Sequence, residues 1–135
     1  MWQVPETKSG KSILVPLVDE TLAILNRRKE DANGPWVFPS RVKPWDPLRD
    51  PRKSWERITA AAGVDDVNIH DLRRTLGSWQ AMSGFSELII GKTLGHSPGS
   101  KATSVYARLD IEPVRESVNS TVALMLEAKG GGDEQ

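Results

Sequence analysis

Apolar and polar positions alternate along this chain with two different periods. Two short apolar runs, residues 2–4 and 12–15, flank a polar turn that contains Gly10, and this arrangement is typical of a β-hairpin. In later segments apolar residues recur every three or four positions, which is the helical period. The pattern predicts a mainly α fold with a small N-terminal β-hairpin. Helices are predicted at about residues 19–29, 51–62, 70–82, 87–94 and 113–128.

Capping residues mark the ends of two of these helices. Asp50 is the predicted N-cap of the second helix, with Pro51 in its first turn and Gly63 after its last turn. Ser86 is the predicted cap of the fourth helix. Gly95 follows that helix and is expected to adopt the left-handed conformation that ends many helices.

The apolar faces of the helices predict the core. The second helix carries an apolar face at i, i+3, i+4 and i+7, and we expect it to be buried. The central helix is expected to bury three large side chains, and a short apolar run before it is assigned a core role beneath the site. The predicted core residues are Trp55, Ile58, Thr59 and Ala62; Leu72, Leu76 and Trp79; and Trp36, Val37 and Phe38.

Composition limits the class of protein. The chain has 135 residues, of which 38% are hydrophobic and 27% charged, as in a single soluble domain with a modest core. Residues 1–128 are assigned to this domain and residues 129–135, rich in glycine, to a disordered tail. We find no signal peptide and no apolar run near the ~20 residues of a membrane span. The absence of cysteine excludes disulfides and thiolate zinc sites, and it suits a reducing cytoplasm.

The formal net charge of zero conceals two regions of opposite sign. Residues 1–108 hold sixteen Lys and Arg against twelve Asp and Glu, whereas residues 109–135 hold two against six. The chain therefore has a body of charge +4 and an acidic C-terminal segment of charge −4. An excess of four positive charges is ordinary for a surface, but it is also compatible with binding to a polyanion.

The best candidate for chemistry is a histidine and an arginine three residues apart, His70 and Arg73, at a predicted helix start. Residues i and i+3 are neighbours on a helix surface, so both side chains can reach one anionic oxygen. His96 follows the fourth helix immediately and is a further candidate donor to an oxyanion. This set predicts a phosphate-binding site.

Five segments together resemble the tyrosine recombinase (phage integrase) family, and the resemblance covers nearly the whole chain. They are, in chain order, Thr-Lys-Ser-Gly-Lys at 7–11, Val-Phe-Pro-Ser at 37–40, His70-x-x-Arg73, Leu-Gly-His at 94–96, and Tyr106. The resemblance implies the catalytic-domain fold of DNA breaking-rejoining enzymes. It also implies cleavage and rejoining of DNA strands through a 3′-phosphotyrosine, in site-specific integration or excision by a mobile element.

The resemblance implies a catalytic role for Lys8, His70, Arg73, His96 and Tyr106. Tyr106 would be the nucleophile, and its phenol, with an ordinary pKa of about 10, needs cationic neighbours to react as phenolate. Arg73 with the two histidines would bind the phosphate oxygens. Lys8 would protonate the leaving 5′ oxygen, as arginine cannot.

Two features leave alternatives open. Lys11 lies in the same turn as Lys8 and is the second choice for the general acid. The family carries another catalytic arginine before the lysine hairpin, which the chain does not include. The resemblance therefore implies the C-terminal part of a catalytic domain, expected to be inactive or weakly active alone. A catalytically inactive module that binds DNA or recombinase subunits, and a type IB topoisomerase-like enzyme, are the alternative functions.

The implied partner is double-stranded DNA, with self-association on DNA through the helix at 113–128 and a cytoplasmic, nucleoid-associated location. No cofactor and no metal are implied. A metallonuclease ranks low, because Asp65, Asp66 and Asp71 crowd around one helix start and no matching carboxylate cluster occurs elsewhere.

Overall fold

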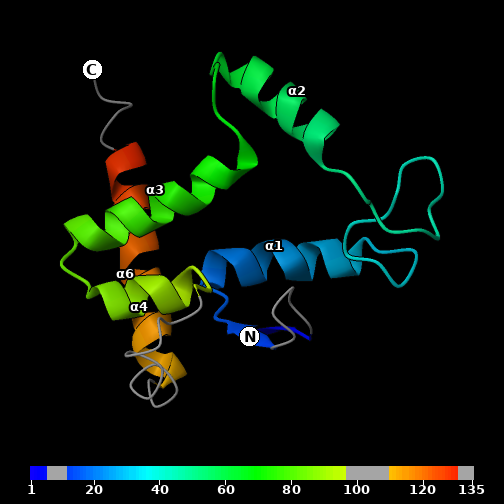
Figure 1. Cartoon of the computed structure of the whole chain (residues 1–135). Coiled ribbons are helices and arrows are strands. Elements are labelled where there is room, and N and C mark those ends of the chain that lie inside the picture. The colour runs from blue at the N-terminus through cyan, green and yellow to red at the C-terminus, as the bar shows by residue number, and fades with distance from the viewer. Residues whose placement is uncertain (6–11, 97–109, 131–135) are drawn as a thin grey trace. The chain divides into compact units, whose positions relative to one another are not determined.

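The computed structural model describes residues 1–5, 12–96 and 110–130. Within them the chain is mainly α-helical with one two-stranded hairpin, so the predicted fold class is confirmed, as is each of the predicted helices (Figure 1). No helix in this described part is both long and apolar enough to cross a membrane. The elements are β1 (Trp2–Val4), β2 (Ile13–Val15), α1 (Asp19–Glu30), α2 (Arg52–Ala62), α3 (Ile69–Met82), α4 (Glu87–Thr93) and α6 (Ile111–Gly130).

The chain divides into two compact units. Unit 1 comprises Met1–Asp19 and Arg73–Gln135, and unit 2 comprises Glu20–Leu72. The division falls inside α3, after its first turn. Unit 1 therefore contains the hairpin, most of α3, and helices α4 and α6, whereas α1 and α2 belong to unit 2.

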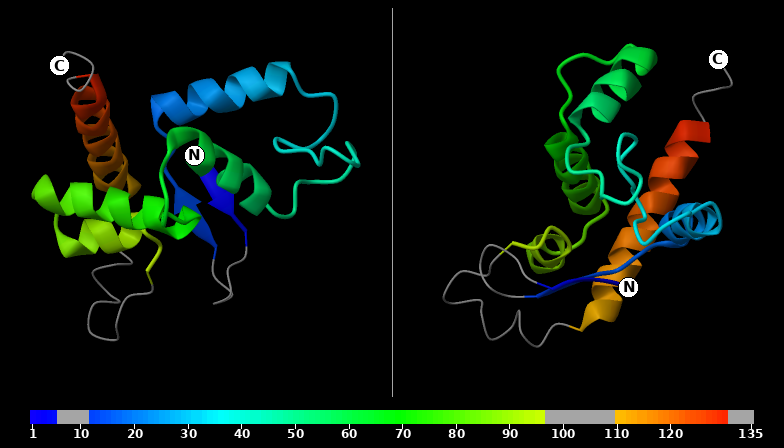
Figure 2. Two further views of the ribbon diagram at one scale, coloured as in Figure 1. Left: turned by 90° about the horizontal axis from the view of Figure 1, so that it is seen from above. Right: turned by 90° about the vertical axis from the view of Figure 1, so that its right-hand side faces the viewer.

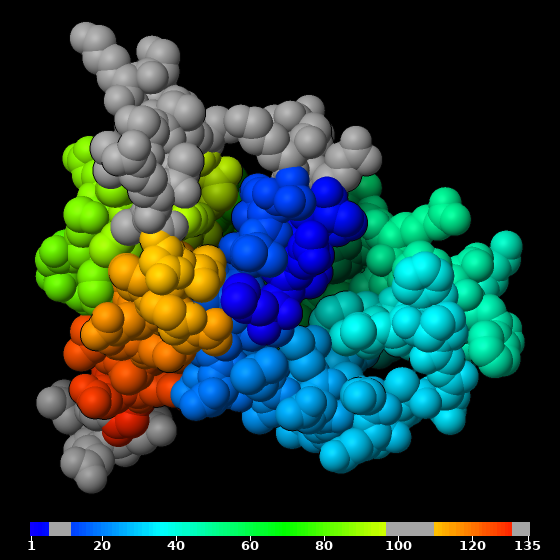
Figure 3. All heavy atoms as spheres, turned by 90° about the horizontal axis from the view of Figure 1, so that it is seen from below, coloured from blue at the N-terminus to red at the C-terminus, as the bar shows by residue number. Residues whose placement is uncertain are grey.

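In unit 1 the hairpin is antiparallel, with Trp2 opposite Val15 and Val4 opposite Ile13. Helices α3 and α4 run beside each other, and α6 crosses both of them (Figures 1 and 2). Helix α4 packs directly on α6. The strands lie beside the first turns of α6 in the space-filling view (Figure 3). The C-terminal helix thus packs within its own chain.

The buried residues of the described part all belong to unit 1. Its apolar core contains Val18 from the segment after the hairpin and Val114 and Val118 from α6. Three polar side chains, those of Gln80, Ser117 and Thr121, are also completely buried. Unit 1 thus combines a small aliphatic core with a buried polar cluster.

Two glycines allow close approach in unit 1. Gly77 is buried in α3, and a Cβ atom on it would lie 3.0 Å from Leu94 Cδ1 and 3.7 Å from Ile90 Cγ2. The close packing of α3 on the end of α4 therefore depends on the missing side chain. Gly95 has φ of +60°, as predicted for the residue that ends α4, and a Cβ on it would lie 3.3 Å from Ile13 Cδ1 of β2.

Unit 2 is organised around a loop between α1 and α2. The indole N–H of Trp36 donates to the carbonyl oxygen of Trp45 (2.7 Å), and Pro39 forms a β-bridge with Pro47. Arg28 at the end of α1 donates to the carbonyl of Val37 (2.9 Å). Its guanidinium carbon lies 4.6 Å from the centre of the Phe38 ring, in a cation–π contact.

The predicted core of unit 2 is wrong. No residue of α1 or α2 is buried, and Ile58 of α2 is 59% exposed. Trp36, Val37 and Phe38 are each at least 41% exposed, because they pack against their own loop and the end of α1 rather than beneath another layer. An amphipathic period shows which face of a helix is apolar, but it does not show that another element covers that face.

Two further predictions need correction in detail. The N-cap position of α2 is Pro51, not Asp50, although Asp50 Oδ1 still accepts the Arg52 backbone N–H (3.0 Å). Side-chain hydrogen bonds from the Arg52 guanidinium lower the pKa of Asp50 to about 2. In α3, Leu72 is 53% exposed, and the fully buried side chain is Gln80, because this polar residue, not Leu72, faces α4 and α6.

Candidate functional site

The first turn of α3 is fixed by a reciprocal cap. The His70 backbone N–H donates to Asn68 Oδ1 (2.9 Å), and the Asn68 N–H donates to Asp71 Oδ2 (2.9 Å). This is a variant of the capping box: the side chain of Asn68 accepts an N–H of the first turn, and the third helical residue, Asp71, accepts the N–H of Asn68. It starts α3 at Ile69 and sets His70 and Arg73 one turn apart on the same helix.

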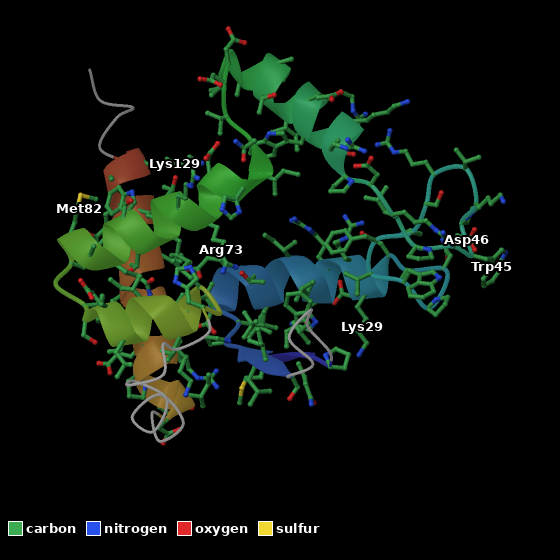
Figure 4. The ribbon with its side chains drawn as sticks, viewed as in Figure 1. Lys29, Trp45, Asp46, Arg73, Met82 and Lys129 are labelled. Atoms are coloured by element: carbon green, nitrogen blue, oxygen red, sulfur yellow. The ribbon has the colours of Figure 1, made fainter. Side chains whose placement is uncertain are left out.

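The position of Arg73 follows from its helical neighbours. Gly77 is four residues after Arg73 and therefore lies on the same face of α3. Because Gly77 faces Leu94 and Ile90, this face of α3 is turned toward the end of α4. Figure 4 shows Arg73 on this side of α3. Its side chain remains exposed.

His96 is positioned by the end of α4. Ser86 caps the start of that helix by accepting the Ile89 backbone N–H, as predicted. At the other end the His96 N–H donates to the carbonyl of Gly91 (2.8 Å) across the left-handed Gly95. The turn therefore fixes the backbone of His96 and leaves its imidazole exposed.

The hairpin reaches the same turn. Ile13 of β2 lies against Gly95, directly before His96. Both belong to unit 1. Lys8 and Lys11 lie outside the described residues, as does Tyr106. Contact between β2 and the turn nevertheless places the base of the lysine hairpin beside the helix end that carries His96.

The donor groups of these side chains are available to a ligand. Among the residues that the structure describes, neither imidazole nor the guanidinium of Arg73 has a hydrogen-bond or ion-pair partner. An exposed arginine and histidine on neighbouring helix ends can bind an anion with several charge-assisted hydrogen bonds. Within the described ranges, no three histidine or carboxylate side chains are grouped so that they could hold a metal ion.

Sequence reasoning missed three residues that shape this site. Asn68 caps α3, and its spacing to Asp71 is a readable capping signal. Gly77 sets the approach of α3 to α4, and a glycine inside a helical pattern was the available clue. Gln80 is fully buried although the predicted core of its helix contains only apolar side chains, and no local signal shows that it has partners on two other helices.

Comparison with known proteins defines the class of this chain. Residues 1–112 match the family model described as the phage integrase family. The match covers most of the chain, so the chain belongs to the phage integrase family.

Two curated relatives come from Escherichia coli strain K12. The prophage integrase IntA is 29% identical over 138 aligned residues, which cover 97% of this chain and 32% of IntA. The prophage integrase IntF is 29% identical over 105 residues, covering 76% of this chain and 22% of IntF. The chain thus spans about a third or less of the length of these relatives. No solved structure matches it significantly.

Proposed function

We propose that this chain forms the C-terminal part of the catalytic domain of a site-specific tyrosine recombinase. The observation that carries the proposal is the packing of α3 on the end of α4 at Gly77. It turns the face of α3 that carries Arg73 toward the turn that carries His96. Family membership and the names of the prophage integrases support recombination as the process.

In the proposed reaction the Tyr106 phenol loses its proton to solvent, because the cationic neighbours favour the phenolate, and the phenolate oxygen attacks a phosphorus of the DNA backbone. The bond from phosphorus to the 5′ oxygen breaks, and that oxygen takes a proton from Lys8, leaving a 3′-phosphotyrosine and a free 5′ hydroxyl. Attack of a 5′ hydroxyl on the phosphotyrosine reverses these steps and rejoins the strands. Lys11 is the second choice for the proton donor.

Arg73 with His70 and His96 would stabilise the charge on the phosphate oxygens in the transition state. The planar guanidinium donates two parallel hydrogen bonds, which suits two equatorial oxygens of a five-coordinate phosphorus. One such preorganised donor commonly contributes ~10²–10³ in rate. Among the described residues, no partner occupies the side-chain donors of these three residues, which is consistent with this role.

Self-association on DNA is part of the proposal. Helix α6 packs on α4, and its Val114 and Val118 are buried, but Leu124 and Leu126 near its other end are 41% and 47% exposed. A neighbouring protomer on DNA would cover this exposed end. Crosslinking through a cysteine at position 126 should be DNA-dependent if that contact forms.

The test is covalent trapping on a nicked DNA substrate whose cleavage releases a short strand and so prevents rejoining. The complete protein in which this chain occurs should form a covalent adduct that survives EDTA and is absent in Tyr106→Phe. An adduct that requires magnesium would overturn the mechanism. DNA binding without any adduct would instead identify a regulator that binds DNA and does not cut it.

A further inference from the structure

A single buried amide connects the three helices of unit 1. Gln80 of α3 is fully buried, and its Nε2 donates to Thr93 Oγ1 of α4 (3.0 Å) and to Ser117 Oγ of α6 (2.8 Å). Both hydroxyls donate their own hydrogens to backbone carbonyls, Thr93 to Ile89 (3.0 Å) and Ser117 to Val114 (2.9 Å). Each hydroxyl can therefore only accept from Gln80, which fixes the orientation of the amide.

Stability alone does not account for this glutamine. Its Oε1 atom is buried without a hydrogen-bond partner in the described part of the chain, and so is the hydroxyl of Thr121. An unsatisfied buried acceptor destabilises the folded state, whereas an apolar side chain of similar shape there is often neutral or stabilising. We therefore attribute to Gln80 a role other than stability: its hydrogen bonds fix the positions of α3, α4 and α6 relative to one another.

Two of the helices joined by Gln80 position proposed phosphate-binding residues: α3 carries Arg73, and the end of α4 leads into His96. Gln80 is seven residues, or two turns, after Arg73 on α3. Thr93 is the last residue of α4 and precedes His96 by three positions. Ser117 lies one turn after the buried Val114 of α6. The Gln80 side chain thus connects α6 to the helix that carries Arg73 and to the helix end that leads into His96.

We propose that Gln80 is a positioning residue that sets the spacing between Arg73 and the His96 turn. Through its hydrogen bond to Ser117, this spacing depends on the position of α6 against α3 and α4. The proposal rests on the proposed recombinase function. In Gln80→Leu the helices still pack, but the α4 end and α6 lose their fixed register. Catalysis depends steeply on such register, since a displacement of ~1 Å can reduce the rate ~100-fold.

The first experiment is native-state hydrogen exchange on the chain itself, and it does not require DNA cleavage. The reporters are three consecutive amides at the α4 end, whose N–H groups donate to the carbonyls of Ile90, Lys92 and Gly91. They are the amides of Leu94, Gly95 and His96. In Gln80→Leu and in Ser117→Ala they should exchange at least ~10-fold faster, while amides within α6 and the melting temperature change little.

The second experiment measures single-turnover cleavage and DNA affinity in the complete protein. Gln80→Leu should lower the cleavage rate by ~10- to 100-fold and leave the DNA dissociation constant within about twofold. The double variant Gln80→Leu/Ser117→Ala should be no slower than Gln80→Leu alone, because both changes cut one connection. Thr121→Val is the matched control, since its buried hydroxyl has no partner among the described residues, and it should keep the parent rate.

The outcomes separate this inference from the proposed function. Unchanged exchange at the three reporter amides in Gln80→Leu overturns the positioning role, whatever the cleavage result. Faster exchange with an unchanged cleavage rate in an active parent overturns it as well. A parent that forms no covalent adduct at all counts against the proposed function, and in that case the exchange measurement alone decides whether Gln80 positions the α4 end.

Discussion

Gly77→Ala tests the packing that brings Arg73 toward the His96 turn. The added Cβ would lie 3.0 Å from Leu94 Cδ1 and 3.7 Å from Ile90 Cγ2. Carbon atoms prefer separations of about 3.5–4.0 Å, so Leu94 must move by roughly 0.5 Å. Such overpacking typically costs ~1–3 kcal/mol.

The same substitution has a favourable term. Alanine is better than glycine inside a helix by ~0.8–1.0 kcal/mol, so the two effects partly cancel. We expect Gly77→Ala to lower the free energy of unfolding by about 1 kcal/mol. For a chain of this size the melting temperature should fall by roughly 3–5 °C.

Urea denaturation followed by circular dichroism measures this difference. Gly130→Ala is the control, because no atom of the described residues lies within 4 Å of its added Cβ, and it should not destabilise the protein. In a Leu94→Ala background the obstructing side chain is gone, so Gly77→Ala should become stabilising by about 1 kcal/mol. If Gly77→Ala stabilises the parent by that amount, Leu94 does not pack on Gly77 and the argument for the site geometry fails.

Three further predictions concern the site directly. In the complete protein, Arg73→Lys should reduce DNA cleavage by at least ~100-fold although the charge is kept, since the guanidinium fork is lost; a near-normal rate in the trapping assay would show that Arg73 does not touch the phosphate. Asn68→Ala should destabilise α3 by about 1 kcal/mol in urea titration, and Asn68→Asp should retain most of the cap; equal losses would exclude the cap as the cause. The 135-residue chain alone should bind DNA weakly and nonspecifically. The logarithm of its association constant should fall with the logarithm of salt concentration, with a slope of about −0.9 per phosphate contacted. Nanomolar, salt-independent binding in a gel-shift titration would contradict this.

The sequence predicted the elements well because their signals are local. The apolar period defines each helix, and Ser86 and the left-handed Gly95 bound α4 as expected. The His70 and Arg73 spacing was also readable, since both lie on one helix. Burial was predicted poorly, because it depends on which elements meet. Ile58 is apolar at the correct period yet exposed, whereas Gln80 is polar yet fully enclosed.

The candidate site was predictable only as a set of residue types. Which face of α3 meets α4 depends on the missing side chain of Gly77, and a sequence pattern does not show what lies opposite a glycine. The catalytic roles of Lys8 and Tyr106, and their position beside Arg73, remain predictions based on the family resemblance.

The absence of any buried residue between Glu20 and Leu72 has a consequence for calorimetry. Heat capacity changes and denaturant slopes scale with the surface exposed on unfolding, and a segment without buried residues exposes less new surface than a packed segment of the same length. The unfolding transition should therefore report mainly on the unit that contains α6, with a slope smaller than chain length suggests. Trp45, Val42 and Ile58 are exposed apolar side chains of this segment. A DNA or protein partner that covers them would produce a negative heat capacity change on binding. Titration calorimetry at several temperatures can therefore measure how much of this segment a partner encloses.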